Sequence, residues 1–478
     1  MTARPLDIYC IAIGGTGMAP LACLLQELGH EVRGSDGPLY PPMSTLLEAA
    51  GIVPEVGFDA GHLDPAAGAS TPDLVIVGNA VPRGNPEAQQ AEALGVERIS
   101  MPQAVARFLL AGRKPVVVAG THGKTTTTAM TAWVLEACGA NPGYLIGGMP
   151  KNLPASFALG SGERFVIEGD EYNASYFDRE AKFLHYRPHT AILTSVEYDH
   201  ADLYPTPEDL LAAYRKLLAL VPKDGLLVAW GDSKQVRQLC SKVRCPVVFY
   251  GFGEDNDVRP MGGSAGVHED AHGASFRIRD PEADAVEIHL QVSGRHNVLN
   301  ALAAWAVARR DGLEASRVAA ALSAFQGTAR RLEELGTVAG VTVVDDFAHH
   351  PTAVRASLEA LRRRFAGRRL TALFEPRSLT AGREMFYDAY RESFRCADRV
   401  LFAPIFHAGR LEPEERLDLE ALVDDLDGDG VSAEACASID EVLSRALALA
   451  RPGDVLVTMS SGGFDGLPRR LLANLEQA

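Results

Sequence analysis

The chain has 478 residues, 47% of them apolar and 23% charged, a length that suggests about three packed domains. A formal net charge of −16 argues against a broad nucleic-acid surface, and seven cysteines without a CxxC pair argue against a disulfide framework or a zinc site. No apolar run reaches the roughly 18 residues that cross a bilayer and the N-terminus lacks a signal-peptide pattern, so we expect a cytoplasmic protein with no membrane span and no obligate protein partner.

Short β-branched runs alternate with helical patterns along the whole chain, which predicts an α/β fold with parallel sheets. We expect three domains: a Rossmann-like domain over residues 1–112, a central P-loop ATPase-like domain with a mostly parallel sheet over 113–327, and a second Rossmann-like domain over 328–478. Beyond those discussed below, strands are predicted at Leu74–Val77, Val341–Val344, Leu370–Phe374, Arg399–Phe402 and Val455–Met459.

The first domain opens with a strand, a glycine turn and a helix, at Ile8–Ile13, Gly14–Gly17 and Met18–Leu28. Asp36 follows about 20 residues after the turn, and this spacing resembles a dinucleotide site. Pro20 takes the place of the third glycine of that pattern, which weakens a nicotinamide interpretation. Asp36 is therefore either a ribose contact or a residue that stabilises the turn.

The second domain begins with the strand Pro115–Ala119, a loop and an amphipathic helix. Glycines in such a loop let backbone N–H groups surround phosphate oxygens, and the helix presents its positive end to the same anion. Lys124 is expected to neutralise the β- and γ-phosphates of ATP, and the Thr125 hydroxyl to bind Mg²⁺. Val118 stands where the generic pattern has its first glycine. The predicted nucleotide contacts are Gly120, Thr121, His122, Gly123, Lys124, Thr125 and Thr126.

Two further side chains are candidate metal ligands because they follow buried strands, and ligands of open α/β sheets collect at that edge. Glu168 follows the strand Phe165–Ile167, and His200 lies past the strand Ala191–Leu193. An N-cap carboxylate is the alternative for Glu168 or Asp170, and a hydrogen-bonded loop histidine is the alternative for His200.

Two segments in the second half of the chain have an unusual composition. Asp255–Gly273 is rich in Gly, Asp and His and is interpreted as a loop. Arg362–Arg364, with Arg368 and Arg369, is the one dense basic stretch and lies at the end of a helical pattern. We interpret it as a helix end stabilised by the dipole, with an anion-binding patch as the alternative.

Several motifs in the same order resemble the Mur ligase family, and the resemblance covers about residues 7–475. GTHGKTT at 120–126 matches the family's variant phosphate loop, and Gly294–Ala301 matches its GxHNxxNxxAA element. Arg330–Glu333 matches the start of the third domain. Asp345–Pro351 matches DDYxHHP, except that Phe347 replaces the tyrosine.

The resemblance implies an ATP-dependent, amide-forming ligase that uses Mg²⁺ and activates a carboxylate as an acyl phosphate. It assigns adenosine contacts to His296, Asn297 and Asn300, a further ATP contact to Asp346, and the UDP diphosphate to Gly15, Thr16 and Gly17. Lys124 and Arg331 would hold the transferring phosphoryl, and Thr125, Glu168 and His200 the metal. His349 would lie near the reacting centre, and closure of the third domain would assemble the site.

Within the family, five local features favour members that join UDP-N-acetylmuramate to a ready-made murein tripeptide over those that add L-alanine. The features lie at 40–45, 79–86, 176–179, 375–378 and 460–464. Arg377 is the candidate for an acceptor carboxylate, with an ion pair to Glu375 as the alternative. The other functions considered are an L-alanine ligase, a nicotinamide-dependent oxidoreductase and a silent nucleotide-binding sensor of muropeptides.

Overall fold

A computed structural model describes residues 4–201, 203–281 and 283–476. The chain divides into two compact units. The first contains Met1–Met149, Leu153–Glu197 and Thr206–Phe249, and the second contains Pro150–Asn152, Tyr198–Pro205 and Tyr250–Ala478. Within the described ranges, no helix has both the length and the apolar character that a membrane crossing requires.

The first unit begins with a five-stranded parallel sheet of order β3-β2-β1-β4-β5. Its strands are β1 (Asp7–Ile11), β2 (Glu31–Asp36), β3 (Glu55–Val56), β4 (Leu74–Val77) and β5 (Glu97–Ser100), with helices α1 (Met18–Glu27), α2 (Met43–Ala49), α3 (Pro86–Ala93) and α4 (Met101–Ala104). The first strand ends at Ile11 rather than at the predicted Ile13. The reason is local, since Ala12 has a φ of 61° and leaves the extended region.

A second sheet of the first unit has the order β12-β11-β10-β6-β9-β7-β8. Its strands are β6 (Lys114–Ala119), β7 (Gly143–Leu145), β8 (Phe157–Ala158), β9 (Arg164–Gly169), β10 (Thr190–Leu193), β11 (Leu226–Trp230) and β12 (Val247–Tyr250), with helices α5 (Lys124–Ala137), α6 (Pro207–Ala219) and α7 (Lys234–Cys240). The central strand β6 is parallel to both neighbours, β9 and β10. The segments that follow these three strands therefore meet at one edge of the sheet.

The second unit contains an antiparallel sheet in which β15 pairs with β13, β14 and β16. Its strands are β13 (Arg259–Pro260), β14 (His268–Asp270), β15 (Gly273–Asp280) and β16 (Ala283–Leu290), and helices α8 (Arg295–Arg310) and α9 (Ala315–Ser323) follow. The prediction of a loop over Asp255–Gly273 is therefore wrong in part. The two short strands in that segment form through pairing with β15, a long-range interaction that local composition does not reveal.

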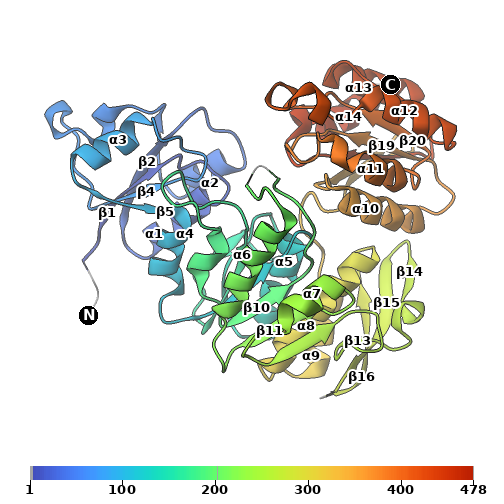
Figure 1. Cartoon of the computed structure of the whole chain (residues 1–478), viewed down its shortest axis with the longest axis horizontal. Coiled ribbons are helices and arrows are strands. Elements are labelled where there is room, and N and C mark those ends of the chain that lie inside the picture. The colour runs from blue at the N-terminus through green and yellow to red at the C-terminus, as the bar shows by residue number, and fades with distance from the viewer. Residues whose placement is uncertain (1–3, 202, 282, 477–478) are drawn as a thin grey trace. The chain divides into compact units, whose positions relative to one another are not determined.

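The last sheet has the order β17-β18-β22-β19-β20-β21, with β17 antiparallel to β18 and the other pairs parallel. Its strands are β17 (Glu333–Val338), β18 (Val341–Asp346), β19 (Leu370–Phe374), β20 (Arg399–Phe402), β21 (Ser432–Ala435) and β22 (Val455–Met459), with helices α10 (Pro351–Arg364), α11 (Tyr387–Phe394), α12 (Leu419–Gly428), α13 (Ile439–Leu449) and α14 (Leu467–Leu475). Helices α10 and α11 cover one face, and α13 and α14 cover the other (Figure 1).

Burial explains why these strands were predictable. Every residue of β18, β19 and β22 is buried, as expected for a parallel sheet covered on both faces. The predicted α/β class with mostly parallel sheets is confirmed. The domain boundaries at 112/113 and 327/328 stay predictions.

Candidate active site

The glycine turn after β1 is held by Asp36. One carboxylate oxygen of Asp36 accepts a hydrogen bond from the Gly14 N–H at 2.7 Å, and the other accepts one from the Gly37 N–H at 2.7 Å. Asp36 therefore stabilises the turn, which is one of its two predicted roles. Gly15–Gly17 follows and leads into α1, where helix N–H groups are available to an anion. The assignment of this turn to the UDP diphosphate stays a prediction.

The phosphate-loop candidate, Gly120–Gly123, joins β6 to α5. Gly120 has a φ of 137° and Gly123 a φ of 80°, values that residues with a β-carbon rarely adopt. A β-carbon on Gly120 would also overlap the Thr194 side chain and the backbone of Ser195. The loop therefore requires glycine at both ends, and it leads directly to a helix N-terminus that favours anions.

The segment after β10, residues 194–197, holds this loop in shape, and we call it the brace. The Thr121 N–H donates to the Ser195 carbonyl at 2.9 Å, and the His122 N–H donates to the Ser195 hydroxyl at 3.0 Å. The Thr121 hydroxyl donates to the Glu197 carbonyl at 3.1 Å, while the His122 ring lies 3.1 Å from the Glu197 carboxylate. Loop and brace form one hydrogen-bonded structure.

Lys124, the first residue of α5, points its ammonium back to the loop. The ammonium donates to the Gly120 carbonyl at 2.8 Å and pairs with the Glu171 carboxylate at 2.9 Å. Burial alone would lower the pKa of Lys124, but the charges of Glu171 and Asp170 outweigh it and raise the pKa. Lys124 is therefore a cation at neutral pH, as phosphate binding requires.

Thr125 and Glu168, two predicted metal ligands, are brought together. The Thr125 hydroxyl donates to Glu168 Oε2 at 3.0 Å, and the Gly147 N–H donates to Oε1 at 2.5 Å. A hydroxyl beside a carboxylate is a donor set that suits Mg²⁺, which prefers oxygen ligands. No helix begins between residues 168 and 181, all of which the structure describes, so Glu168 and Asp170 are not N-caps.

His200, the third predicted ligand, belongs to the second unit and is described there with His349. Its φ is 54°, and its N–H donates to the Asp199 carboxylate at 2.7 Å. Burial would raise the pKa of Asp199, but His200, His349 and His350 outweigh it and lower the pKa. These three histidines therefore lie within electrostatic reach of one buried carboxylate. The Tyr390 hydroxyl donates to the His349 carbonyl at 2.5 Å and fixes that backbone.

The predicted adenosine contacts lie at the start of α8. Asn300 donates to the Asn297 side-chain oxygen at 3.1 Å, and Asn297 donates to the Ser293 carbonyl at 2.8 Å. Burial lowers the pKa of His296 to about 4, helped by the charges of Arg331 and Arg363. His296 is thus neutral at pH 7 and lies within electrostatic reach of Arg331, the predicted phosphoryl ligand.

Asp346, at the end of β18, uses both carboxylate oxygens within the protein. Oδ2 accepts from the Leu332 N–H at 2.7 Å, and Oδ1 accepts from the Ala348 N–H at 2.7 Å. It therefore fixes the backbone beside Arg331 and His349. The predicted ATP contact of Asp346 is not tested by this geometry, but a positioning role is directly visible.

Arg377 lies after β19, where its guanidinium donates to the Glu375 carboxylate at 3.3 Å. The alternative raised by the sequence, an ion pair with Glu375, is therefore present. The Arg377 guanidinium carbon also lies 3.9 Å from the centre of the Phe406 ring. Arg377 thus contacts both Glu375 and Phe406 within the fold, and its binding role stays a prediction.

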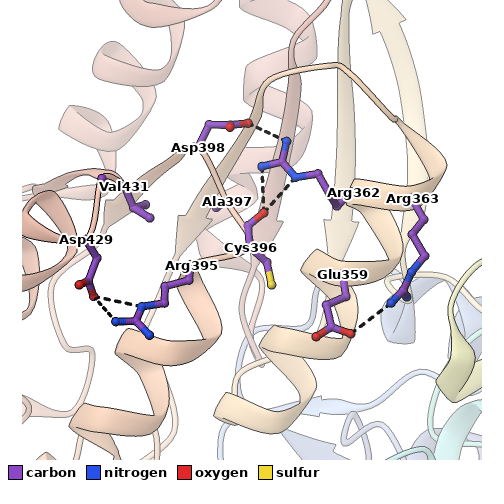
Figure 2. Close-up of a pocket in the computed structure, with 10 residues that line it drawn as sticks. Glu359, Arg362, Arg363, Arg395, Cys396, Ala397, Asp398, Asp429 and Val431 are labelled. Atoms are coloured by element: carbon purple, nitrogen blue, oxygen red, sulfur yellow. Dashed lines mark hydrogen bonds and ion pairs between the residues drawn. The ribbon is translucent and has the colours of Figure 1, made fainter.

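The basic stretch at the end of α10 borders a cavity of about 580 Å³ (Figure 2). Arg362 donates to Asp398 at 2.9 Å and to the Cys396 carbonyl, and Arg363 lies 3.5 Å from Glu359. The remaining members are also engaged, Arg364 with Glu334, Arg368 with backbone carbonyls, and Arg369 with Asp454. These pairs account for the stretch, which we assign to the stability of the helix end.

Sequence reasoning missed three residues that the structure places against predicted ones: Glu171 on Lys124, Glu197 on His122, and Phe406 on Arg377. Glu171 and Glu197 follow the buried strands β9 and β10, and Glu168 lies near the end of β9, so their positions carried a signal. Phe406 carried none, because an aromatic residue in a loop is not distinguishable from a core residue before the strands are placed.

The comparisons with known proteins agree along the whole chain. Residues 7–113 match the Mur ligase family, catalytic domain; residues 118–308 match the Mur ligase middle domain; and residues 330–462 match the Mur ligase, glutamate ligase domain. The UDP-N-acetylmuramate–L-alanyl-γ-D-glutamyl-meso-2,6-diaminoheptandioate ligase of Escherichia coli K12 is 38% identical over 98% of both chains.

Two further relatives are similar over nearly the whole chain. The UDP-N-acetylmuramate–L-alanine ligase of Desulfitobacterium hafniense is 32% identical, covering 96% of this chain and 97% of its own. The crystal structure of a murein peptide ligase from Psychrobacter arcticus is 34% identical, with a TM-score of 0.73 and 99% of both chains covered. Members of the matched family are ATP-dependent, amide-forming ligases. The chain belongs to the Mur ligase family.

Proposed function

We propose that this ligase joins UDP-N-acetylmuramate to the tripeptide L-alanyl-γ-D-glutamyl-meso-diaminopimelate, with ATP converted to ADP and phosphate. The observation that carries the proposal is similarity over nearly the whole chain to a ligase of that specificity. The cationic Lys124 in a glycine loop supports the ATP-dependent step. Such a reaction serves the reuse of murein peptides inside the cell, which agrees with the cytoplasmic location expected from the sequence.

The chemistry requires a carboxylate to become an electrophile. The lactyl carboxylate attacks the γ-phosphorus and the bond to ADP breaks, which gives an acyl phosphate. The tripeptide amine then attacks the acyl carbon, the bond from that carbon to the phosphate oxygen breaks, and phosphate and the amine proton leave as the amide forms. Lys124 and Arg331 would stabilise charge on the transferring phosphoryl group. These groups would act by orienting the reactants and by neutralising charge, without forming a covalent bond to the substrate.

Within the first unit, the Thr125 hydroxyl and the Glu168 carboxylate fit a magnesium ion and would hold it, and when bound it would neutralise phosphate charge. His200, in the second unit, stays a predicted further ligand. Within the chain, Glu168 fixes the Thr125 hydroxyl, and the brace keeps the loop backbone in place. Asp346 fixes the turn that carries Arg331.

A phosphate-release assay tests the proposal. We expect phosphate only when ATP, UDP-N-acetylmuramate and an acceptor are all present, and a higher kcat/KM for tripeptide than for L-alanine. The second candidate is the L-alanine ligase, favoured by 32% identity to a ligase of that specificity. A clear preference for L-alanine contradicts the tripeptide assignment, and no phosphate with any acceptor favours a silent binding protein.

A further inference from the structure

Three loops of the C-terminal sheet meet around Arg377. They follow β19, β20 and β22, which are neighbours or near neighbours in the sheet. The Glu375 N–H donates to the Met459 carbonyl at 3.0 Å, and the Phe406 N–H donates to the Pro376 carbonyl at 3.1 Å. The first bond holds the end of β22 against the loop that carries Arg377, and the second holds the loop after β20 against it.

The Arg377 guanidinium lies against both neighbouring loops. Its central carbon is 3.9 Å from the centre of the Phe406 ring, which is a close cation–π contact. A β-carbon on Gly462 would overlap Nε, Cδ and Cζ of Arg377, so this arginine occupies the space that a side chain at 462 would take. Phe406 and Gly462 together determine where the guanidinium lies.

The turn that carries Gly462 is itself fixed. The Ser460 hydroxyl donates to the Glu375 carboxylate, and the Gly462 N–H donates to the Ser460 hydroxyl at 2.9 Å. Arg330 donates to the Ser460 carbonyl at 2.8 Å and also to the Gly462 carbonyl. The surface on which Arg377 rests is therefore rigid, and a substitution in it is not easily absorbed.

Most donors of Arg377 stay available despite this close packing. Among the described residues, its one hydrogen-bond acceptor is Glu375, which is 1% exposed and gives its other oxygen to Ser460. A guanidinium has five N–H groups, and the Arg377 side chain is 30% exposed. An arginine with a purely structural role would use more of its donors within the chain, as Arg362 and Arg369 do.

The surroundings favour a negatively charged ligand with an aliphatic part. Burial lowers the pKa of His407, and the charges of Arg410 and Arg377 lower it further while Glu375 opposes them, so two cationic groups lie close to this loop. The Phe406 ring is 50% exposed, an unusual state for a phenylalanine, and it offers an apolar surface beside the free N–H groups. A carboxylate next to a methylene chain matches both features.

We propose that Phe406 is a positioning residue that, together with Gly462, holds Arg377 to receive a carboxylate of the acceptor peptide, while the Phe406 ring packs against the adjoining methylene groups. This inference rests on the proposed function, because it takes a carboxylate-rich peptide as the acceptor. The recognised chemical class is a peptide with a carboxylate on an aliphatic side chain or terminus, bound bidentately by the guanidinium.

The test compares four proteins: wild type, Phe406→Ala, Phe406→Tyr and Phe108→Ala. Phe108 also contacts an arginine, Arg107 at 5.3 Å, but belongs to the first unit, so it controls for loss of an arginine–aromatic contact as such. The acceptors are the tripeptide and three derivatives, each with one carboxylate converted to the amide. Steady-state KM values for acceptor and ATP are measured with each protein.

We expect Phe406→Ala to raise the KM for tripeptide about 3–30-fold while the KM for ATP stays within about twofold. One amide derivative will bind worse than the tripeptide to the wild type, and this difference will shrink in Phe406→Ala. Phe406→Tyr keeps the ring and will stay close to wild type, as will Phe108→Ala. Equal effects on both KM values, or undiminished discrimination against every amide, overturn the proposal.

A binding measurement separates this inference from the proposed function. Calorimetry of tripeptide binding in the presence of ADP and UDP-N-acetylmuramate repeats the comparison without turnover. If tripeptide binding is weaker in Phe406→Ala than in the wild type, as expected, but the wild type releases no phosphate, the result contradicts the proposed function alone. Protein that binds tripeptide equally with and without the ring contradicts this inference alone, and protein that binds none contradicts both. If Phe406→Ala does not fold, Phe406→Leu must show the same loss.

Discussion

Lys124 and Glu171 form a buried pair of opposite charges beside the phosphate loop, and the pair leads to two expectations at the scale of single residues. The Glu171 side chain is 2% exposed and that of Lys124 is 13% exposed. Breaking a buried pair by removing one partner leaves an uncompensated charge, which is strongly destabilising. Substituting Lys124 or Glu171 separately should therefore have measurable effects on activity or stability.

Lys124→Ala is expected to lower kcat for phosphate release at least about a hundredfold, because a preorganised charge at the transferring phosphoryl is lost. Circular dichroism should show a folded protein with a lower Tm than the wild type, because Glu171 loses the Lys124 charge. Lys223→Ala, an exposed lysine in the same unit, is the control and should be active. Near-normal turnover by the Lys124 variant would remove this residue from the site.

Glu171→Gln is expected to lower Tm, since it removes a counter-charge of Lys124 while keeping a similar shape. ADP should restore more stability to this variant than it adds to the wild type, because the phosphates then replace the missing charge without first displacing Glu171. The measurement is the Tm shift at saturating ADP. Identical shifts in the two proteins would show that Glu171 does not compete with phosphate.

His296 provides a prediction with a defined pH window. Its pKa falls from 6.5 to about 4 on burial, so the unfolded chain binds a proton more readily than the folded one between these values. The stabilising contribution is complete above pH 6.5 and is lost as pH falls through 4. NMR titration of the imidazole signals, assigned with His296→Gln, should show one histidine titrating near pH 4. A His296 signal that titrates near 6.5 contradicts its burial in a cationic environment.

Part of the site was predictable at this scale and part was not. Lys124, Thr125 and Glu168 could be placed together because parallel strands end at one edge of a sheet. The choice of Glu171 as partner of Lys124 could not be made, because Glu168, Asp170 and Glu171 lie within one non-helical segment. Sequence spacing does not say which of three nearby carboxylates turns toward the loop.

At the scale of elements, strands that are buried on both faces could be predicted from the sequence, whereas short edge strands could not. The predicted strands Leu370–Phe374, Arg399–Phe402 and Val455–Met459 have the same bounds in the structure. The short strands β13 and β14 were taken for loop. They form by pairing with β15, and no local sequence pattern indicates that pairing.

Gly120 tests the loop as an element. Gly120→Ala is expected to destabilise the fold by about 1–3 kcal/mol and to raise the KM for ATP, because its φ of 137° and its contact with the brace both exclude a β-carbon. Gly428→Ala is the matched control, since a β-carbon there meets nothing within 4 Å. Urea unfolding and ATP kinetics provide the two measurements. A Gly120 variant with normal values in both would show that the loop adapts.

At the scale of the whole molecule, a net charge of −16 must be reconciled with anionic substrates. The long-range field of the protein repels ATP and the UDP-sugar, whereas short-range donors at the loop and arginines bind them. Salt reduces the Debye length from about 30 Å at 0.01 M to about 8 Å at 0.15 M. Screening therefore weakens the long-range repulsion more than the short-range attraction.

We accordingly expect kcat/KM for ATP to rise as NaCl is increased from about 0.01 M to about 0.15 M at constant magnesium. The thermal unfolding curve should be recorded at each salt concentration, so that a change in stability is not mistaken for a change in association. A steady fall of kcat/KM over this range would mean that local positive potential already dominates at long distance.

The brace at 194–197 explains how the loop keeps its form although Val118 stands where the generic pattern has glycine. Val118 is an ordinary, fully buried strand residue, and curvature begins only at Gly120. Hydrogen bonds between the loop and the brace stabilise that curvature. Grafting residues 120–125 alone into another protein would therefore transfer the sequence of the loop but not its conformation. A functional graft must include the brace at 194–197 as well.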